Sequence, residues 1–277
     1  MACEDTVRQQ HCASTAPEFL GDLGARFALE HRWRSKAAFL KKYGESRVQM
    51  GTGPELSVFP DGSRSTSIGH FVRRFGDAAE IAKDEMVFEF AKPVAESLPG
   101  EGRGNWMATG LRRDFKIPEQ LASLTPEGVA QGNSAAVLSL GDDEAGLPYH
   151  SHGAAWLAVV FGAKRWFIWE PGTMPAPVRR SFNPLASTAT WARQHWNSSL
   201  LGSGLIVCDQ KPGELLYLPE RWMHATMNLG ETVAVGAQVP GFDVGGWITA
   251  SRETLSRAEA CSYPAPPPPS QLKQPLS

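Results

Sequence analysis

The sequence predicts a mostly β fold, in which a sandwich or barrel of antiparallel strands is flanked by helices. The first observation is that eight short apolar runs, each bounded by turn residues, follow one another between residues 134 and 240. The second is that apolar residues at helical spacing occur mainly on either side of this region. Because most of these runs are joined by short turns rather than by crossover helices, they favour antiparallel pairing over βαβ units.

The part of the chain before residue 134 is expected to be largely helical. Residues 1–16 are polar and unpatterned, which indicates a flexible arm. Pro17–Lys42 carries apolar residues at helical spacing and predicts one or two helices, which end at the glycine cap Gly44. The other expected elements are a strand at Arg47–Met50, a helix near Ser67–Phe75 with Ser67 as its N-cap, a strand at Met86–Phe90, a loop at 97–110 and short helical turns at 114–131.

The strand-rich region at 134–240 is expected to form the barrel core. Its predicted strands are Ala135–Leu140, Leu147–His152, Trp156–Phe161, Lys164–Trp169, Leu205–Asp209, Glu214–Leu218, Trp222–Met227 and Thr232–Val239. Gly162 and Ala163 predict a tight hairpin, and the long connection at 170–202 contains a predicted helix at Ser187–Trp196. After the core we expect a helix at about 246–260 and a Pro-rich disordered tail at 261–277.

The composition argues against several classes of function. The 277 residues contain 27 Lys and Arg against 29 Asp and Glu, which gives a formal net charge of −2. Such a chain lacks the basic excess that displaces counterions from nucleic acid, so no nucleic-acid partner is expected. No apolar run approaches the roughly 18 residues that a spanning helix needs, so we expect a soluble protein without a membrane span.

The sequence gives only weak indications of a cellular compartment. The N-terminus has no apolar segment typical of a secretory signal. The four cysteines show neither a CxxC pair nor the density of a disulfide framework. These features favour the cytoplasm or the nucleus. The sequon at Asn197 leaves a luminal location open, if a leader has been removed.

Three histidines of the strand-rich region have the spacing of a metal site. His150 and His152 lie two residues apart, so on a strand both imidazoles point to the same face. His224 lies on another predicted strand, which a barrel can bring beside the first. Three imidazole donors with open positions suit Fe, Zn, Cu or Ni. The H-x-H pair by itself is weak evidence, because histidines of a core or a surface produce it as well.

Four segments of this region together resemble a known family. They read His150-Ser151-His152, Gly162-Ala163-Lys164-Arg165-Trp166, Pro212-Gly213-Glu214-Leu215-Leu216-Tyr217-Leu218-Pro219 and Trp222-Met223-His224-Ala225-Thr226-Met227-Asn228-Leu229. In this order they resemble a JmjC domain, and within that family the small JmjC-only group whose first motif also reads H-x-H-G. The resemblance implies a cupin-type double-stranded β-helix, a jelly-roll barrel. It extends over roughly residues 30–245, so we expect a single domain at 17–260, with a helical part at 17–133 and the barrel core at 134–240.

The resemblance also implies roles for individual residues. His150 and His224 match the two metal histidines of Fe(II)- and 2-oxoglutarate-dependent oxygenases, and His152 stands where most active members have Asp or Glu. Lys164 matches the basic residue that pairs with the distal carboxylate of 2-oxoglutarate, and a bound dianion does need a fixed cation. Asn228 shares a strand face with His224, from which it could donate into the pocket. The implied cofactors are Fe(II), or another divalent metal, and 2-oxoglutarate as co-substrate.

Three departures from the family pattern keep other functions open. His152 replaces a carboxylate, Leu147 stands where many members have Thr or Ser, and Trp156 stands where several hydroxylases carry Asn. The function that the resemblance implies first is that of a 2-oxoglutarate-dependent dioxygenase that hydroxylates a side chain of a protein or peptide. The alternatives are a catalytically silent interaction protein that keeps the barrel, and a 2-oxoglutarate-independent three-histidine cupin. The sequence does not define the substrate or the oligomeric state.

Overall fold

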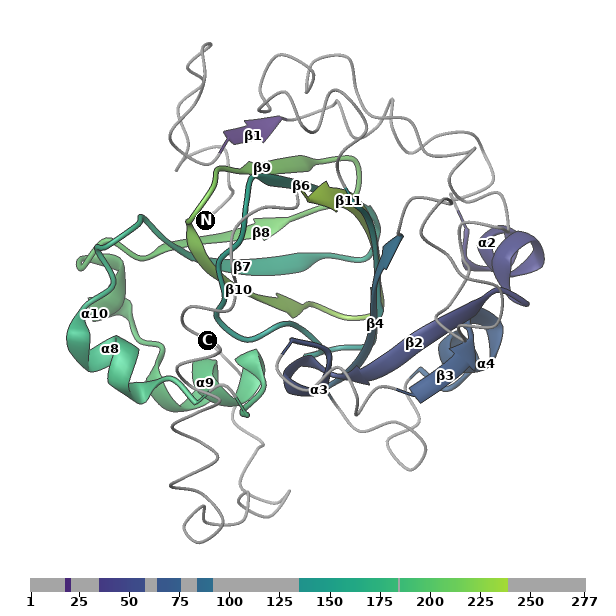
Figure 1. The fold of residues 1–277 in the computed structure, drawn as a ribbon, viewed down its shortest axis with the longest axis horizontal. Helices are drawn as coiled ribbons and strands as arrows, with labels where there is room; N and C mark the ends of the chain where they lie inside the picture. The colour runs from purple at the N-terminus through teal and green to yellow at the C-terminus, as the bar shows by residue number, and fades with distance from the viewer. Residues whose placement is uncertain are drawn as a thin grey trace, which may run out of the picture.

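Two antiparallel β-sheets, one large and one small, form the centre of the molecule (Figure 1). The computed structural model describes residues 18–20, 35–57, 64–75, 84–91, 135–183 and 185–238. The strands are β1 (Glu18–Leu20), β2 (Arg47–Thr52), β3 (Arg64–Ser67), β4 (Glu85–Ala91), β5 (Ala135–Gly141), β6 (Ala155–Phe161), β7 (Lys164–Trp169), β8 (Ile206–Gln210), β9 (Leu215–Leu218), β10 (Met223–Asn228) and β11 (Thr232–Gln238). The helices are α2 (Lys36–Tyr43), α3 (Gly53–Ser57), α4 (Ile68–Arg73), α8 (Ala176–Ser181), α9 (Thr188–His195) and α10 (Ser198–Leu201).

The order of the strands is that of a jelly roll. The large sheet has eight strands in the order β1-β9-β6-β11-β5-β4-β2-β3, and the small sheet has three in the order β10-β7-β8. The strand pairs are antiparallel throughout both sheets of the described residues. The molecule is thus mostly antiparallel β-sheet with flanking helices, consistent with a jelly-roll cupin fold. The predicted fold class is confirmed.

The central strands of the large sheet are buried on both faces. Successive residues of β5, β6, β9 and β11 contribute alternately to two apolar clusters, as the two-residue period of a strand requires. One cluster joins the large sheet to the small one: Val137, Leu157, Val159, Leu216, Leu218 and Ala234 pack against Trp166, Ile168 and Cys208. This double burial explains why these segments read in the sequence as nearly continuous apolar runs.

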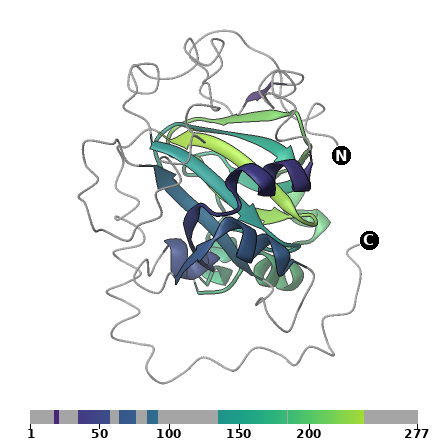
Figure 2. The ribbon, with the colours of Figure 1, turned by 90° about the vertical axis from the view of Figure 1, so that its right-hand side faces the viewer.

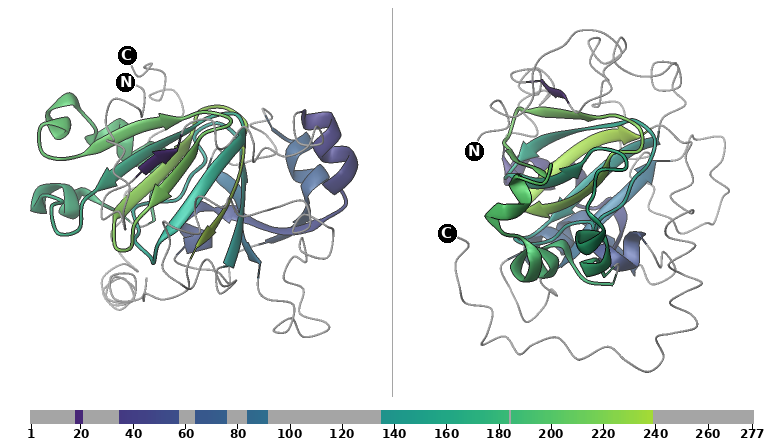
Figure 3. Two further views of the ribbon diagram at one scale, coloured as in Figure 1. Left: turned by 90° about the horizontal axis from the view of Figure 1, so that it is seen from above. Right: turned by 90° about the vertical axis from the view of Figure 1, so that its left-hand side faces the viewer.

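Helices cover the outer faces of both sheets. Phe39 and Tyr43 of α2 and Phe71 of α4 belong to the cluster on the outer face of the large sheet. Figure 2 shows these helices in front of the strands. On the small sheet, Trp191 of α9 packs against Phe167 of β7, with their ring centroids 5.6 Å apart. Figure 3 shows the two groups of helices at opposite sides of the molecule.

Local sequence signals account for several helix ends and turns. Ser35, Ser67 and Ser187 each accept a hydrogen bond from the backbone N–H three residues later, as N-cap side chains do. Gly162 forms the hairpin between β6 and β7 with φ at +80°, and a Cβ there would lie 2.0 Å from the carbonyl oxygen of Glu231. The predicted N-cap at Ser67 and the predicted hairpin are therefore confirmed.

Some predicted elements are wrong. Helices were expected over Pro17–Lys42, but Glu18–Leu20 is a strand that pairs with β9. The end of this prediction is confirmed, since α2 has Gly44 as its C-cap, and residues 21–34 lie outside the described residues. The region 17–133 was expected to be largely helical with strands at Arg47–Met50 and Met86–Phe90; β2 and β4 confirm these two strands, whereas β1 and β3 were not predicted. Pairing with a distant strand decided these segments, and local periodicity carries no information about such pairing.

Other differences concern short elements and parts outside the described residues. The elements β3, α3, α8 and α10, each four to six residues long, were not predicted. The sequon residue Asn197 is the N-cap of α10. The predictions for residues 1–16, 97–110, 114–131 and 246–277 lie outside the described residues. Among the helices that the structure describes, none is long and apolar enough to cross a membrane.

Candidate metal centre

The backbone of residues 145–152 runs antiparallel to β10 and brings two histidines opposite each other. The N–H of His150 donates to the carbonyl of His224, and the N–H of His224 donates back to His150, both at 2.9 Å. Further along, Thr226 donates to Leu147 at 3.0 Å. The predicted strand at Leu147–His152 is not regular, because only an isolated bridge forms at His150 and Pro148 has no N–H to offer. The reciprocal pair nevertheless fixes the two histidines side by side.

Gly146 allows this segment to approach β10. A Cβ at this position would lie 1.8 Å from the carbonyl oxygen of Thr226, well inside van der Waals contact. Any side chain would therefore push residues 145–152 away from β10. The position of His150 depends on the absence of a side chain four residues earlier.

The three predicted histidines come together in one cluster, the three-histidine centre. The ligand atoms of His150, His152 and His224 all lie within 4.8 Å of one another. The ring centroids of His150 and His224 are 4.2 Å apart, those of His152 and His224 are 4.6 Å apart, and those of His150 and His152 are 5.2 Å apart. This is a spacing that one cation can bridge.

Backbone carbonyls fix the tautomer of each imidazole. Nδ1 of His150 lies 2.8 Å from the carbonyl oxygen of Pro148, Nδ1 of His152 lies 2.7 Å from that of Gly153, and Nδ1 of His224 lies 2.8 Å from that of Trp222. A carbonyl oxygen can only accept, so each Nδ1 carries the proton in the neutral ring. Each Nε2 then keeps its lone pair for a cation, and the carbonyls hold the rings in place. The sequence analysis missed these contacts, because backbone acceptors leave no signal in side-chain motifs.

Burial keeps the three imidazoles neutral. Desolvation lowers the pKa of His150, and it lowers the pKa of His224 well below the usual range, with the charges of His150 and His152 acting in the same direction. Desolvation, followed by the charge of His150, lowers the pKa of His152 to about 3. A neutral imidazole is the form that binds a metal. The centre is thus ready for a cation near neutral pH without first losing protons.

Lys164 lies in the same cavity as the three histidines. The cavity is lined by residues of both sheets, among them the three histidines, Ser139, Thr226 and Lys164. The Lys164 side chain is 1% exposed, and its Nζ donates to Oδ1 of Asn228 at 2.7 Å. Burial lowers the pKa of the Lys164 amine to about 7. A buried cation in contact with a neutral amide is a position where an anionic group would be bound.

Asn228 does not take the position expected from the sequence. Its Oδ1 accepts from Lys164, and its Nδ2 donates to the carbonyl of Asp142 at 3.2 Å. Asn228 is not among the described residues that line the cavity. Asn228 orients Lys164, which faces it directly in the register of β10 and β7.

Thr226, whose Oγ1 accepts from the N–H of Leu147 at 3.2 Å, lines the cavity in place of Asn228. The alternation of side chains along β10 does place Thr226 on the same face as His224.

The two apolar departures from the family pattern also face the cavity. Leu147 and Trp156 are both buried and both line it. The cavity has a volume of about 40 Å³. Small-molecule sites usually occupy about 300–1,000 Å³. A larger groove of about 320 Å³ lies next to it and shares His152, with Tyr149, Met223, Arg179 and Arg221 among its lining residues. The centre therefore has a narrow interior beside a wider outer groove.

The comparisons with known proteins point to one family. The chain is 37% identical over 90 residues to JmjC domain-containing protein 8 of Mus musculus, covering 32% of each chain. It is 30% identical over 109 residues to lysine-specific demethylase JMJ21 of Arabidopsis thaliana, covering 35% of this chain and 12% of that one. It is 21% identical over 245 residues to arginine-specific demethylase JMJ20 of the same plant, covering 82% of this chain and 53% of that one.

The extent of these matches is limited. The match spans about a third of the length of the JmjC domain-containing protein 8 sequences from Mus musculus and Homo sapiens. No family model matches the chain. The likeness therefore rests on individual relatives, the jelly-roll fold and the histidine cluster. Taken together, these findings support the assignment of this chain as a JmjC-domain protein.

Proposed function

We propose that this protein is an Fe(II)- and 2-oxoglutarate-dependent oxygenase that hydroxylates a side chain of a protein. The observation that carries the proposal is the presence of three neutral imidazoles and one buried lysine around a single cavity. We also propose that residues 17–260 form one domain, since strands from residues 18–91 complete the same sheet as strands from the barrel core.

The chain's own residues supply the two binding functions that this reaction needs. His150, His152 and His224 would hold the metal through Nε2, while the carbonyls on Nδ1 keep the rings oriented. Lys164 would bind the far carboxylate of 2-oxoglutarate, and Asn228 would hold Nζ in position. Iron held by these residues would supply the chemistry for oxidation of 2-oxoglutarate by O₂ to succinate and CO₂, with one oxygen atom going into succinate and the other into a C–H bond of the substrate.

The substrate class follows from the neighbouring groove and the relatives. The groove of about 320 Å³ shares His152 with the centre, which would bring a bound peptide next to the metal. Two of the relatives are named as a lysine-specific and an arginine-specific demethylase, whose names describe action on amino-acid side chains. A protein side chain is therefore the substrate class we propose, without a choice among residue types.

The size, lining and ligand set of the cavity favour a second function, in which the protein binds metal but does not turn over 2-oxoglutarate. The cavity of about 40 Å³ is small for a five-carbon dicarboxylate, and Leu147 and Trp156 offer apolar surface where a dianion needs partners. His152 in place of a carboxylate leaves a bound metal one charge more positive and shifts its redox balance. These features favour a JmjC protein that binds metal without turning over 2-oxoglutarate, either as an interaction protein or as a three-histidine cupin.

The test separates metal binding from turnover. Purified protein is titrated anaerobically with Fe(II) and then with 2-oxoglutarate, and succinate release is measured in air. The proposal expects one Fe(II) per chain, binding of 2-oxoglutarate only after the metal, and succinate formation that Lys164→Met abolishes. The exposed Lys211→Met is the matched control and should leave all three steps unchanged. Iron uptake without succinate would contradict the oxygenase and support the second function.

A further inference from the structure

An open hollow of about 540 Å³ lies at the outer edge of the large sheet, where β2, β3 and α4 meet. Four arginines from these elements line it: Arg47, Arg64, Arg73 and Arg74. His70 and the hydroxyl residue Ser65 line it as well. We call this surface the arginine hollow. None of its residues belongs to the three-histidine centre or to the groove beside it.

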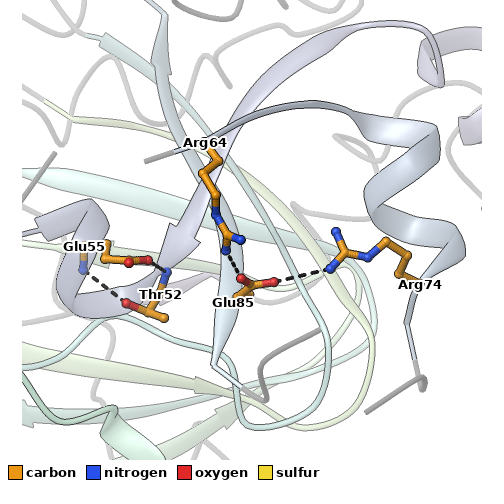
Figure 4. A network of polar contacts seen from close by, with 5 residues as sticks. All are labelled: Thr52, Glu55, Arg64, Arg74 and Glu85. Carbon is orange, nitrogen blue, oxygen red and sulfur yellow. Dashed lines mark hydrogen bonds and ion pairs between the residues drawn. The ribbon is translucent and has the colours of Figure 1, made fainter. Parts of the chain in front are cut away.

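A buried carboxylate anchors two of these arginines. Arg64 from β3 and Arg74 from the end of α4 converge on Glu85 of β4 (Figure 4). Arg64 pairs with Oε1, and Nη2 of Arg74 lies 3.6 Å from Oε2. The Glu85 side chain is 6% exposed, whereas that of Arg64 is 59% exposed. One buried carboxylate thus contacts two guanidinium groups at the rim of the hollow.

The remaining arginines add charge to this framework. Nη2 of Arg47 donates to the hydroxyl of Ser65 at 3.0 Å, a neutral acceptor that leaves the charge in place. Arg73 is exposed on the same side of α4 as the hollow. Among the described residues, the lining of the hollow includes no carboxylate, although the chain as a whole has a net charge of −2. The positive charge is therefore a local concentration rather than a property of the entire surface.

We propose that the arginine hollow binds a compact anion with two or more phosphate groups. Guanidinium groups present paired N–H donors that match phosphate oxygens, and several of them surround one volume here. A hollow lined by residues of β2, β3 and α4 offers its donors to a compact ligand from several sides. Nucleic acid would need an extended basic surface, for which the overall charge provides no support. This site is independent of the proposed oxygenase activity.

The test uses the full chain with EDTA present, so that the three-histidine centre holds no metal. Tripolyphosphate is titrated by calorimetry at several salt concentrations. We expect saturable binding of one anion per chain that weakens as salt rises. The double variant Arg47→Gln, Arg73→Gln should weaken it at least about 10-fold, because both side chains line the hollow and neither pairs with Glu85. Circular dichroism checks that the variant is folded.

Two control variants and three competing ligands make the result decisive. The double variant Arg180→Gln, Lys211→Gln removes the same charge from exposed positions elsewhere, and Lys164→Met removes the buried cation of the cavity. Both should bind tripolyphosphate as the parent protein does. An equal loss in either control would overturn the proposal. So would tighter binding of citrate, of a single-stranded oligonucleotide or of anionic phospholipid vesicles than of tripolyphosphate.

Discussion

The three-histidine centre and the arginine hollow place cationic groups in opposite environments. In the centre, Lys164 is 1% exposed, and its acceptor among the described residues is the amide oxygen of Asn228. In the hollow, several guanidinium groups lie in contact with solvent around one buried carboxylate. In the desolvated centre, each charged or polar group contributes strongly to the binding of a ligand. In the hollow, water and salt screen the charges and weaken the contribution of each guanidinium group. One substitution should therefore disable the centre, and several are needed to disable the hollow.

The largest effect is expected from removal of the histidines. The double variant His150→Ala, His224→Ala deletes two of three donors and should weaken binding of a divalent metal by more than about 100-fold, beyond what loss of an orienting contact costs. Metal titration followed by spectroscopy measures this. The matched control is His195→Ala on α9, outside the cluster. If the double variant binds metal as the parent does while circular dichroism shows a folded barrel, the assignment of the ligands is wrong.

The next effect concerns the approach of residues 145–152 to β10. Gly146→Ala would place a Cβ 1.8 Å from the carbonyl oxygen of Thr226 and force the two segments apart. We expect a loss of about 1–3 kcal/mol in the free energy of unfolding. Metal affinity should fall with it, since the reciprocal bonds between His150 and His224 are strained. Gly202→Ala, where the nearest atom is 3.5 Å from the new Cβ, serves as the control in urea unfolding. Equal stabilities of the two variants would contradict the close approach.

A pH dependence follows from the buried lysine. Burial lowers the pKa of Lys164 from 10.5 to about 7, so the unfolded chain binds one more proton than the folded chain between these values. Stability from this group therefore rises with pH through that window, by up to about 1.4 kcal/mol per pH unit. Lys164→Met should stabilise the protein more at about pH 6 than at about pH 10.

Urea unfolding of both proteins at the two pH values measures this difference, since other titrating groups cancel in the comparison. Lys211→Met, at an exposed position, should show no such trend. The same protonation predicts that binding of a dianion in the cavity weakens as pH rises above about 7. A stability difference between the parent and Lys164→Met that does not change with pH would refute the lowered pKa.

The smallest effect is expected from a single arginine of the hollow. Arg64→Gln removes one partner of Glu85 but leaves Arg74 in place. Since Arg64 is largely exposed, the free energy of unfolding should change by less than about 1 kcal/mol. The change should also shrink at high salt. Thermal unfolding at two salt concentrations tests this, and a loss as large as that of Gly146→Ala would show that the two environments do not differ as described.

The sequence by itself determined the fold class and the residues of the candidate site. Short apolar runs joined by turns predicted antiparallel strands, and the order of H-x-H, the Lys164 segment and the His224 segment indicated which residues could form the site. These features could be predicted because buried strands and tight turns each have a characteristic pattern within a few neighbouring residues. The same locality explains the error at Glu18–Leu20, where pairing with a distant strand decided the conformation.

Only the tertiary structure decided how these residues meet. It brought His224 beside His150 through two backbone hydrogen bonds, turned Asn228 towards Lys164 rather than into the cavity, and set the volume that Leu147 and Trp156 leave open. It also gathered Arg47, Arg64, Arg73 and Arg74 around one hollow, which no motif had indicated. The physical reason is that distances between strands, burial and the resulting pKa values depend on packing between segments far apart in the chain, and a linear pattern does not contain that packing.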